Sequence, residues 1–351
     1  MTKQPTIEMC FTMPAEWQEH KATWLSWPHN KEDWPDKFAP IPWVYAEIIR
    51  HLTQVERVRL LVKNEKQKND ASDVLKRAGA NLKRVDFYEI PTDRVWLRDS
   101  GPIFVRDAKG KKHMLDWRFN AWAKYDNHKR DDKVPQKIEA INRLPRIQPM
   151  HNGKRVVLEG GSIDVNGKGT LITTEECLLS TVQQRNPGFK RSDYEAVFEK
   201  YLGIQQIIWL DKGIVGDDTH GHVDDITRFV DENTIVTAVE SNKKDDNHAL
   251  LKENLKRLKK ARNEKGKPFT IAELPMPKPL MFEGERLPAS YANFLIANEL
   301  VLVPTFNDAN DRVALNILAE LMPRHTIIGI HAVDLVWGLG TIHCMSQQEP
   351  A

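Results

Sequence analysis

The chain has 351 residues, of which 40% are hydrophobic and 28% are charged. This composition is typical of a folded globular protein with a large buried core. Lys and Arg number 51 against 49 Asp and Glu, and the net charge of +2 gives no general electrostatic field for nucleic acid or an anionic membrane.

The same composition bears on the cellular compartment. The first residues contain no apolar signal core, and no stretch approaches the apolar length that crosses a bilayer. Three scattered cysteines, Cys10, Cys177 and Cys344, argue against a disulfide framework and fit a reducing compartment. We therefore expect a cytoplasmic protein with neither a membrane nor a nucleic acid as its partner.

The N-terminal quarter of the chain alternates predicted helices and strands. Apolar periodicity, interrupted by Pro28 and Gly79, predicts a strand at 22–28, a helix at 43–56, a strand at 58–62, a helix at 65–78 and a strand at 85–90.

Four predicted β-hairpins follow, with strands at 102–106 and 113–117, 161–165 and 170–173, 226–230 and 234–237, and 294–296 and 300–304. Their turn residues Asp107, Asn166, Asp231 and Asn298 are separated by 59, 65 and 67 residues. Helices are predicted between the hairpins at 193–202, 246–262 and 311–321.

A period near 65 residues divides this chain into about five α/β units. Units that each carry a half-buried sheet stack into a solenoid or a ring, and we favour a ring: a five-bladed, pseudo-symmetric α/β propeller with a central cleft, formed by one domain over residues 1–351. The N-terminal strand and the segment 326–344 would complete the last blade together. The alternative is a two-domain α/β protein in which the hairpin spacing is incidental.

Acidic residues occur at nearly one phase of this repeat. Asp99 precedes its turn by eight residues, and Glu159 and Asp224 precede theirs by seven, as does Tyr291 in the fourth hairpin. Positions of equal phase meet near the axis of a ring. We therefore expect the three carboxylates to share one cleft.

His222 and Cys344 should join these carboxylates, since they fall in the third and fifth units. Individually, each residue has a structural explanation: Asp99 could cap a turn, Glu159 could accept from backbone N–H groups, and Cys344 could be a small buried hydrophobic residue. Their common phase favours a functional site.

Converging carboxylates are costly to bury unless a cation joins them. A planar guanidinium can accept two carboxylates side by side, which leaves its central carbon open to attack by a thiolate. Cys344 would then be the nucleophile, and His222 would protonate the departing ammonia and activate a water. A free thiol titrates near pH ~8.5, so a cationic substrate would help to form the thiolate.

Two other functions remain open at this point. Residues 219–225 (THGHVDD) resemble the metal-binding run of metallo-β-lactamase-like hydrolases, and two histidines with two aspartates could hold zinc. The last position of that metal-binding run is a histidine, but this chain has Asp225 there. The zinc hypothesis also gives Cys344 no role. A non-catalytic polyamine-binding protein with an acidic central cleft is the second alternative.

Several motifs in a fixed order also carry a family resemblance: residues 13–17 (MPAEW), 96–102 (WLRDSGP), 119–122 (FNAW), 158–161 (LEGG), 221–224 (GHVD), 289–294 (ASYANF) and 342–344 (IHC). With these motifs the chain resembles, nearly end to end, the agmatine deiminase and bacterial peptidylarginine deiminase family of guanidine-modifying enzymes. The resemblance implies a five-bladed α/β propeller and hydrolysis of a small cationic guanidine, with no metal or organic cofactor. It allows, without requiring, a homo-oligomer.

The same resemblance assigns roles residue by residue. It implies that Cys344 is the nucleophile and His222 the general acid and base, that Asp99 and Asp224 bind the guanidinium, and that Glu159 orients His222 or contacts the substrate. It also places two tryptophans in the substrate pocket, Trp96 and Trp122.

Two segments depart from the family pattern. Where plant-like agmatine deiminases have GGGNIHC this chain has GLGTIHC at 338–344, and alanine, lysine and tyrosine follow the FNAW motif at 123–125 in place of glycines. We expect these changes to affect substrate choice more than chemistry. Agmatine, giving N-carbamoylputrescine for putrescine biosynthesis, is the first expectation, and peptidylarginine or another guanidine is the alternative.

Overall fold

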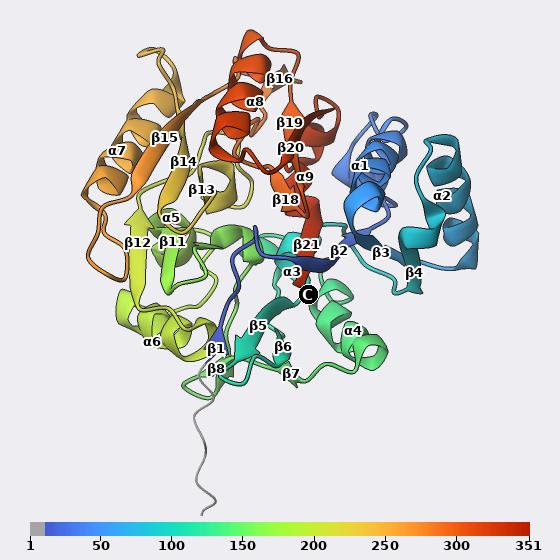
Figure 1. Cartoon of the computed structure of the whole chain (residues 1–351), viewed down its shortest axis with the longest axis horizontal. Coiled ribbons are helices and arrows are strands. Elements are labelled where there is room, and N and C mark those ends of the chain that lie inside the picture. Colours follow the sequence, from blue (N-terminus) through green and yellow to red (C-terminus); the bar gives the residue numbers. More distant parts are fainter. Residues whose placement is uncertain (1–10) are drawn as a thin grey trace, which may run out of the picture.

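The computed structural model describes residues 11–351, so the predictions about the N-terminal leader and Cys10 lie outside the described residues. Its strands form five principal sheets that repeat one pairing scheme (Figure 1). In each sheet, an antiparallel pair is extended by a strand that runs parallel to the second member of the pair. The sequence prediction of a repeated α/β unit is therefore confirmed.

The strands are distributed among the five sheets as follows. The first sheet contains β1 (Phe11–Thr12), β5 (Ile103–Asp107), β6 (Lys112–Leu115) and β7 (Arg146–Ile147). The next three contain β10 (Asp164–Val165), β11 (Thr170–Thr174) and β12 (Gln206–Leu210); β13 (Thr227–Phe229), β14 (Thr234–Val239) and β15 (Thr270–Pro275); and β18 (Leu295–Ala297), β19 (Leu300–Thr305) and β20 (Thr326–His331). The fifth contains β21 (Ser346–Pro350), β2 (His20–Ser26), β3 (Arg57–Val62) and β4 (Val85–Glu89).

Helices make the parallel crossovers, because a parallel strand cannot be reached by a tight turn. These helices are α1 (Ile41–Val55), α2 (Glu65–Arg77), α4 (Val134–Asn142), α5 (Glu175–Leu179), α6 (Arg191–Leu202), α7 (Asp246–Lys260) and α8 (Ala309–Leu321). In Figure 1 the longer helices lie around the outside of the molecule, and β21 and the short helices α3 (Leu97–Ser100) and α9 (Ile342–Met345) lie near its middle.

The predicted helix boundaries follow the expected capping chemistry. Asn64 caps the start of α2 by accepting from the backbone N–H of Gln67, and Asp308 and Asp311 form a capping box at the start of α8. α6 ends at Gly203, whose φ of 73° is left-handed, and an added Cβ there would lie 2.1 Å from the Phe11 carbonyl oxygen.

The pairing of the chain's two ends differs from the prediction in one respect. The segment Thr326–His331 does not join the N-terminal strand: as β20 it pairs in parallel with β19, because α8 returns the chain to that sheet. The strand that meets β2 is β21, which follows Cys344. No sheet formed by residues 11–351 closes on itself.

A short helix or tight turn precedes the first strand of each repeated unit, and this is where the site is built. α3 precedes β5, the 3-10 turns Gly160–Ser162 and Val223–Asp225 precede β10 and β13, a buried segment around Asn293 precedes β18, and α9 precedes β21. Five equivalent segments therefore meet in the interior. No helix among residues 11–351 is long and apolar enough to cross a membrane.

Candidate active site

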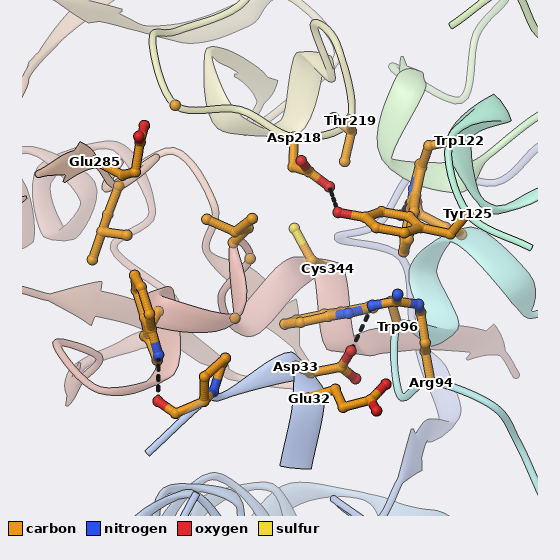
Figure 2. A pocket seen from close by; sticks show the side chains of 18 of the residues that line it. Glu32, Asp33, Arg94, Trp96, Trp122, Tyr125, Asp218, Thr219, Glu285 and Cys344 are labelled. Atoms are coloured by element: carbon orange, nitrogen blue, oxygen red, sulfur yellow. Dashed lines mark hydrogen bonds and ion pairs between the residues drawn. The ribbon is translucent and has the colours of Figure 1, made fainter. Parts of the chain in front are cut away.

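A cavity of about 370 Å³ opens above the sulfur of Cys344 (Figure 2). Asp99, Trp96 and Trp122 also line it, so the structure brings these four predicted residues to one place. Charged and aromatic side chains from several inter-sheet connections form its rim: Glu32, Asp33, Arg94, Tyr125, Asp218, Glu285 and Trp337.

Cys344 lies on α9, and its side chain is in contact with polar groups. Its thiol lies 3.7 Å from Asp224 Oδ2, and Asn293 Nδ2 donates a hydrogen bond of 3.0 Å to the sulfur. Burial, followed by the charge of Asp224, raises the pKa of the Cys344 thiol well above its ordinary value. The thiol is therefore protonated in the free protein at neutral pH.

His222 is fully buried between two carboxylates. Its Nδ1 lies 3.8 Å from Asp99 Oδ1, and its Nε2 lies 3.8 Å from Glu159 Oε2. Burial by itself lowers the pKa of His222, but the charge of Asp99 and the neighbouring Cys177 and Glu159 outweigh burial and hold the pKa well above its ordinary value. The imidazole therefore carries a proton that it can donate.

Glu159 is held by a buried arginine that the sequence did not predict for the site. Arg185 Nε donates to Glu159 Oε1 at 3.1 Å, and both side chains are fully buried. Burial favours the neutral acid, but the charge of Arg185 and then His222 lower the pKa of Glu159 to about 2. Glu159 is thus an anion that faces His222 with its other oxygen.

Asp99 is fixed at the cavity wall by two donors. The indole Nε1 of Trp122 donates to Asp99 Oδ2 at 2.9 Å, and the backbone N–H of Gly161 donates to Asp99 Oδ1 at 3.1 Å. Burial raises the pKa of Asp99 to about 6; His222 opposes this rise, and the nearby carboxylates of Asp224 and Glu159 add to it.

Asp224 belongs to a chain of polar contacts that continues to the N-terminal region. Nδ1 of His343 lies 2.7 Å from Asp224 Oδ2, and Nε2 of the same ring lies 2.8 Å from Glu16 Oε2. The hydrogen bond and charge of His343 outweigh burial and lower the pKa of Asp224. Asp224 Oδ1 has no hydrogen-bond partner among residues 11–351, so it is free to accept one from a ligand.

Gly161 shows how closely these groups approach one another. A methyl group on its Cα would lie 2.6 Å from His222 Nδ1 and 3.0 Å from carboxylate oxygens of both Asp224 and Asp99. Only glycine fits where these three side chains meet.

Comparison with known proteins places this arrangement in a family. The family model for Porphyromonas-type peptidyl-arginine deiminase matches residues 12–350. The chain belongs to that family. An agmatine deiminase of Stutzerimonas stutzeri is 36% identical, with 97% of this chain and 96% of the relative covered, and one of Pseudomonas aeruginosa is 35% identical over the same shares.

Solved structures agree with this membership. An agmatine deiminase of Enterococcus faecalis matches this peptidyl-arginine deiminase family member with a TM-score of 0.88 and 30% identity, covering 97% of this chain and 96% of that chain. A cysteine-to-serine variant of a C. jejuni agmatine deiminase with substrate bound gives a TM-score of 0.87 and 30% identity, covering 100% and 99%. The predicted family resemblance is confirmed.

Asn293 is a site residue that was not identified by counting back from the turn of the fourth hairpin. That count gave Tyr291, whose hydroxyl instead donates a hydrogen bond of 2.8 Å to Asp311 Oδ1. Asn293, two residues later, contacts the Cys344 sulfur and accepts from the Thr341 hydroxyl at 2.7 Å through its own side-chain oxygen. Asn293 lies two residues before the start of β18, whereas Asp99 lies four residues before the start of β5, so the inward position is not at a constant distance from the strand.

The geometry does not assemble the zinc site suggested by residues 219–225. Two clusters of His, Cys, Asp and Glu within residues 11–351 lie close enough to share an ion: Glu159 with Cys177 and His222, and Asp224 with Asp225 and Cys344. His220 belongs to neither, since its Nε2 contacts the Ser180 hydroxyl at 3.1 Å. The histidine pair required by that hypothesis is therefore not formed.

Proposed function

We propose that this chain hydrolyses agmatine to N-carbamoylputrescine and ammonia. The observation that carries this proposal is a buried cluster in which Asp99, Asp224 and His222 meet at Gly161. The Cys344 sulfur lies 3.7 Å from Asp224 Oδ2, and Asp99 and Cys344 line the cavity. Relatives named agmatine deiminase that align over nearly the whole chain, at 34–36% identity, favour agmatine among guanidines. A hydrolase acting on a linear amidine is the corresponding reaction class.

Asp99 and Asp224 would bind the guanidinium. Both are buried acids near the sulfur or the cavity wall, and Asp224 keeps an oxygen without a partner among the described residues. Carboxylates pair with a planar guanidinium through charge-assisted hydrogen bonds, which also neutralise the buried negative charge. Trp96 and Trp122 would enclose the substrate. Glycine at position 340 leaves space for the Trp96 ring, because an added Cβ there would lie 2.9 Å from a ring carbon of Trp96.

The substrate's own charge would activate Cys344. The same carboxylate charges that raise the pKa of this thiol are offset when a guanidinium binds between them, so the thiol can release its proton to solvent. The thiolate then forms a bond to the guanidinium carbon and gives a tetrahedral adduct.

His222 would move the protons in both halves of the reaction. The imidazolium donates its proton to one nitrogen, the C–N bond breaks, and ammonia leaves behind a thiouronium on Cys344. The neutral imidazole then takes a proton from water, and the oxygen attacks the same carbon to give a second tetrahedral adduct. The C–S bond breaks as the hydroxyl proton is released to solvent, which gives the neutral ureido product and the thiolate. Glu159, which is held by Arg185, would keep the His222 ring in place through both steps.

The architecture suits a site assembled from one chain. We propose that the five repeated units form a five-bladed, pseudo-symmetric ring within a single domain, with the active site where their inner segments meet. All of the proposed catalytic groups come from one copy of the chain, so the chemistry would require no second subunit.

The test is release of ammonia and ureido product from agmatine, free arginine and an arginine-containing peptide under the same conditions. Rapid turnover of agmatine alone supports the proposal. Preferential turnover of the peptide would leave the mechanism unchanged but show that the substrate is arginine in a protein. Binding of agmatine without turnover would favour a polyamine-binding protein.

A further inference from the structure

A second thiol lies on the far side of the proposed general acid and base. Cys177 is on α5 and is buried, and the ligand atoms of Cys177, His222 and Glu159 all lie within 4.8 Å of one another. Nothing in the proposed deimination requires a thiol at this position, because Cys344 supplies the nucleophile from α9.

Polar atoms in this cluster are buried without partners. Both ring nitrogens of His222 and Oε2 of Glu159 form no hydrogen bond with any group in residues 11–351, although their side chains are fully buried. Buried polar atoms in proteins are nearly always satisfied, so their lack of partners points to a ligand that can join them.

The spacing of these atoms suits one tetrahedral ion better than a direct contact. His222 Nε2 and Glu159 Oε2 are 3.8 Å apart, which is too long for a hydrogen bond. Two such ligands on one zinc, at bond lengths of about 2.0–2.2 Å, are separated by about 3.4 Å. A small side-chain adjustment would therefore bring both atoms within bonding distance of one ion.

We propose that Glu159, Cys177 and His222 form a binding site for a thiophilic divalent cation such as Zn²⁺, and that occupancy of this site inhibits the enzyme. Thiolate, imidazole and carboxylate are the three ligand types that zinc takes from proteins, and three protein ligands leave a fourth position for water.

Charge balance permits an ion at this depth. Zinc binds thiolate and neutral imidazole, so binding releases the protons of these ligands to solvent and the charge of the ion offsets that loss. Arg185 remains on Oε1 of Glu159 and leaves Oε2 to the metal. The cluster adjoins the cavity wall, since Asp99 lines the cavity and its Oδ1 lies 3.8 Å from His222 Nδ1.

Inhibition follows from the proposed function, on which this part of the inference rests. A metal-bound His222 can neither protonate ammonia nor accept a proton from water. The inhibitory site therefore predicts that a chelator protects activity, whereas a catalytic zinc would make the chelator inhibitory.

Cd²⁺ titration of the protein tests the site without turnover, because a cadmium–thiolate bond produces an ultraviolet charge-transfer band. The chain has three cysteines, so the matched variants are Cys10→Ser, Cys177→Ser and Cys344→Ser. We expect the band in wild type, Cys10→Ser and Cys344→Ser, and its loss in Cys177→Ser and Cys177→Ala. Circular dichroism melting confirms that each variant is folded.

Zn²⁺ inhibition of agmatine turnover then tests the consequence. Loss of even an outer-shell partner weakens metal binding at least about tenfold, so Cys177→Ser should raise the half-inhibitory Zn²⁺ concentration by about tenfold or more relative to wild type and Cys10→Ser. A band that persists in Cys177→Ser but disappears in Cys344→Ser would overturn the proposal and place the ion at the nucleophile. No band in wild type, or unchanged Zn²⁺ sensitivity in Cys177→Ser, would also overturn it. If agmatine is not a substrate, the Cd²⁺ band still decides the site independently.

Discussion

The floor of the cavity and its rim are built in different ways. We call the floor the cavity-lining residues Asp99 and Cys344 together with the buried residues behind them, Glu159, His222 and Asp224. All five lie in inner segments that precede the first strand of a repeated unit. Every one is buried, and several are held by neighbours that are buried as well, such as Glu159 by Arg185 and Asp224 by His343.

The rim consists of charged and aromatic residues on connecting segments. Arg94 pairs with Asp33 at 2.5 Å and lies over the Tyr125 ring at 4.2 Å, and the Tyr125 hydroxyl donates to Asp218 at 2.7 Å. Lys124 also pairs with Asp218 and is substantially exposed. Asp33 is buried, but Arg94 and Tyr125 are only partly buried and Lys124 is exposed, so most rim contacts constrain their side chains less than the buried contacts of the floor.

On the proposed function, residues of the repeated inner segments carry out the chemistry, and residues of the connecting segments influence substrate access. A buried charge without its partner is costly, so floor substitutions should have large effects on the chemical step. Rim substitutions should have small effects that fall mainly on substrate affinity.

Cys344→Ala should have the largest effect. Without the thiol no covalent adduct forms, so kcat for agmatine should fall by at least about 10⁴-fold, the scale seen when a nucleophile is deleted. Ammonia release measures this, with Cys10→Ser as the matched control that keeps wild-type turnover. Activity of Cys344→Ala near the wild-type level would show that Cys344 is not the nucleophile.

Asp224→Asn and Asp225→Asn form a matched pair at adjacent positions. Asp224 is charged, whereas burial and the charge of Asp224 raise the pKa of Asp225 well above its ordinary value and keep it neutral. We expect kcat/KM to fall about 10²–10³-fold for Asp224→Asn, and less than about tenfold for Asp225→Asn, whose amide mimics the protonated acid. Equal losses would contradict the assigned charges.

The acid limb of the pH profile should report Asp99. Its pKa is raised to about 6, so the carboxylate is ionised above that pH and neutral below it. Because guanidinium binding needs the ionised form, kcat/KM should fall about tenfold per pH unit as the pH drops below 6. Asp99→Asn should lower kcat/KM and remove this limb, and an unchanged limb in that variant would assign it to another group.

Lys124→Ala should have the smallest effect, since it removes only an exposed ion pair at the rim. Such pairs contribute at most about 1 kcal/mol, so kcat/KM should change by less than about fivefold, with the change in KM. Steady-state kinetics with agmatine measure both constants. A large loss of kcat would show that the rim takes part in the chemical step.

The same division explains what the sequence could predict. Period and phase predicted the convergence of Asp99, Glu159, Asp224, His222 and Cys344, because equivalent positions in a repeat occupy equivalent places in the fold.

Long-range partners could not be predicted this way. Arg185 and Cys177 reach the site from the connection between β11 and β12, and Glu16 reaches His343 across 327 residues of sequence. Residues in these connections do not recur at a fixed distance from the turns, so counting along the repeat cannot identify them. The pairing of β21 with β2 was predicted only in outline, because the choice between β20 and β21 depends on the crossover made by α8.

The most direct test of the central claim is a single-turnover experiment with enzyme in excess over agmatine. Samples are quenched in acid at successive times, and peptides containing Cys344 are examined by mass spectrometry. We expect a transient thiouronium adduct on Cys344 that forms with ammonia release and decays as the ureido product appears. Product formed at an unchanged rate by Cys344→Ala, with no adduct on Cys344 in the wild-type protein at any time, would contradict it.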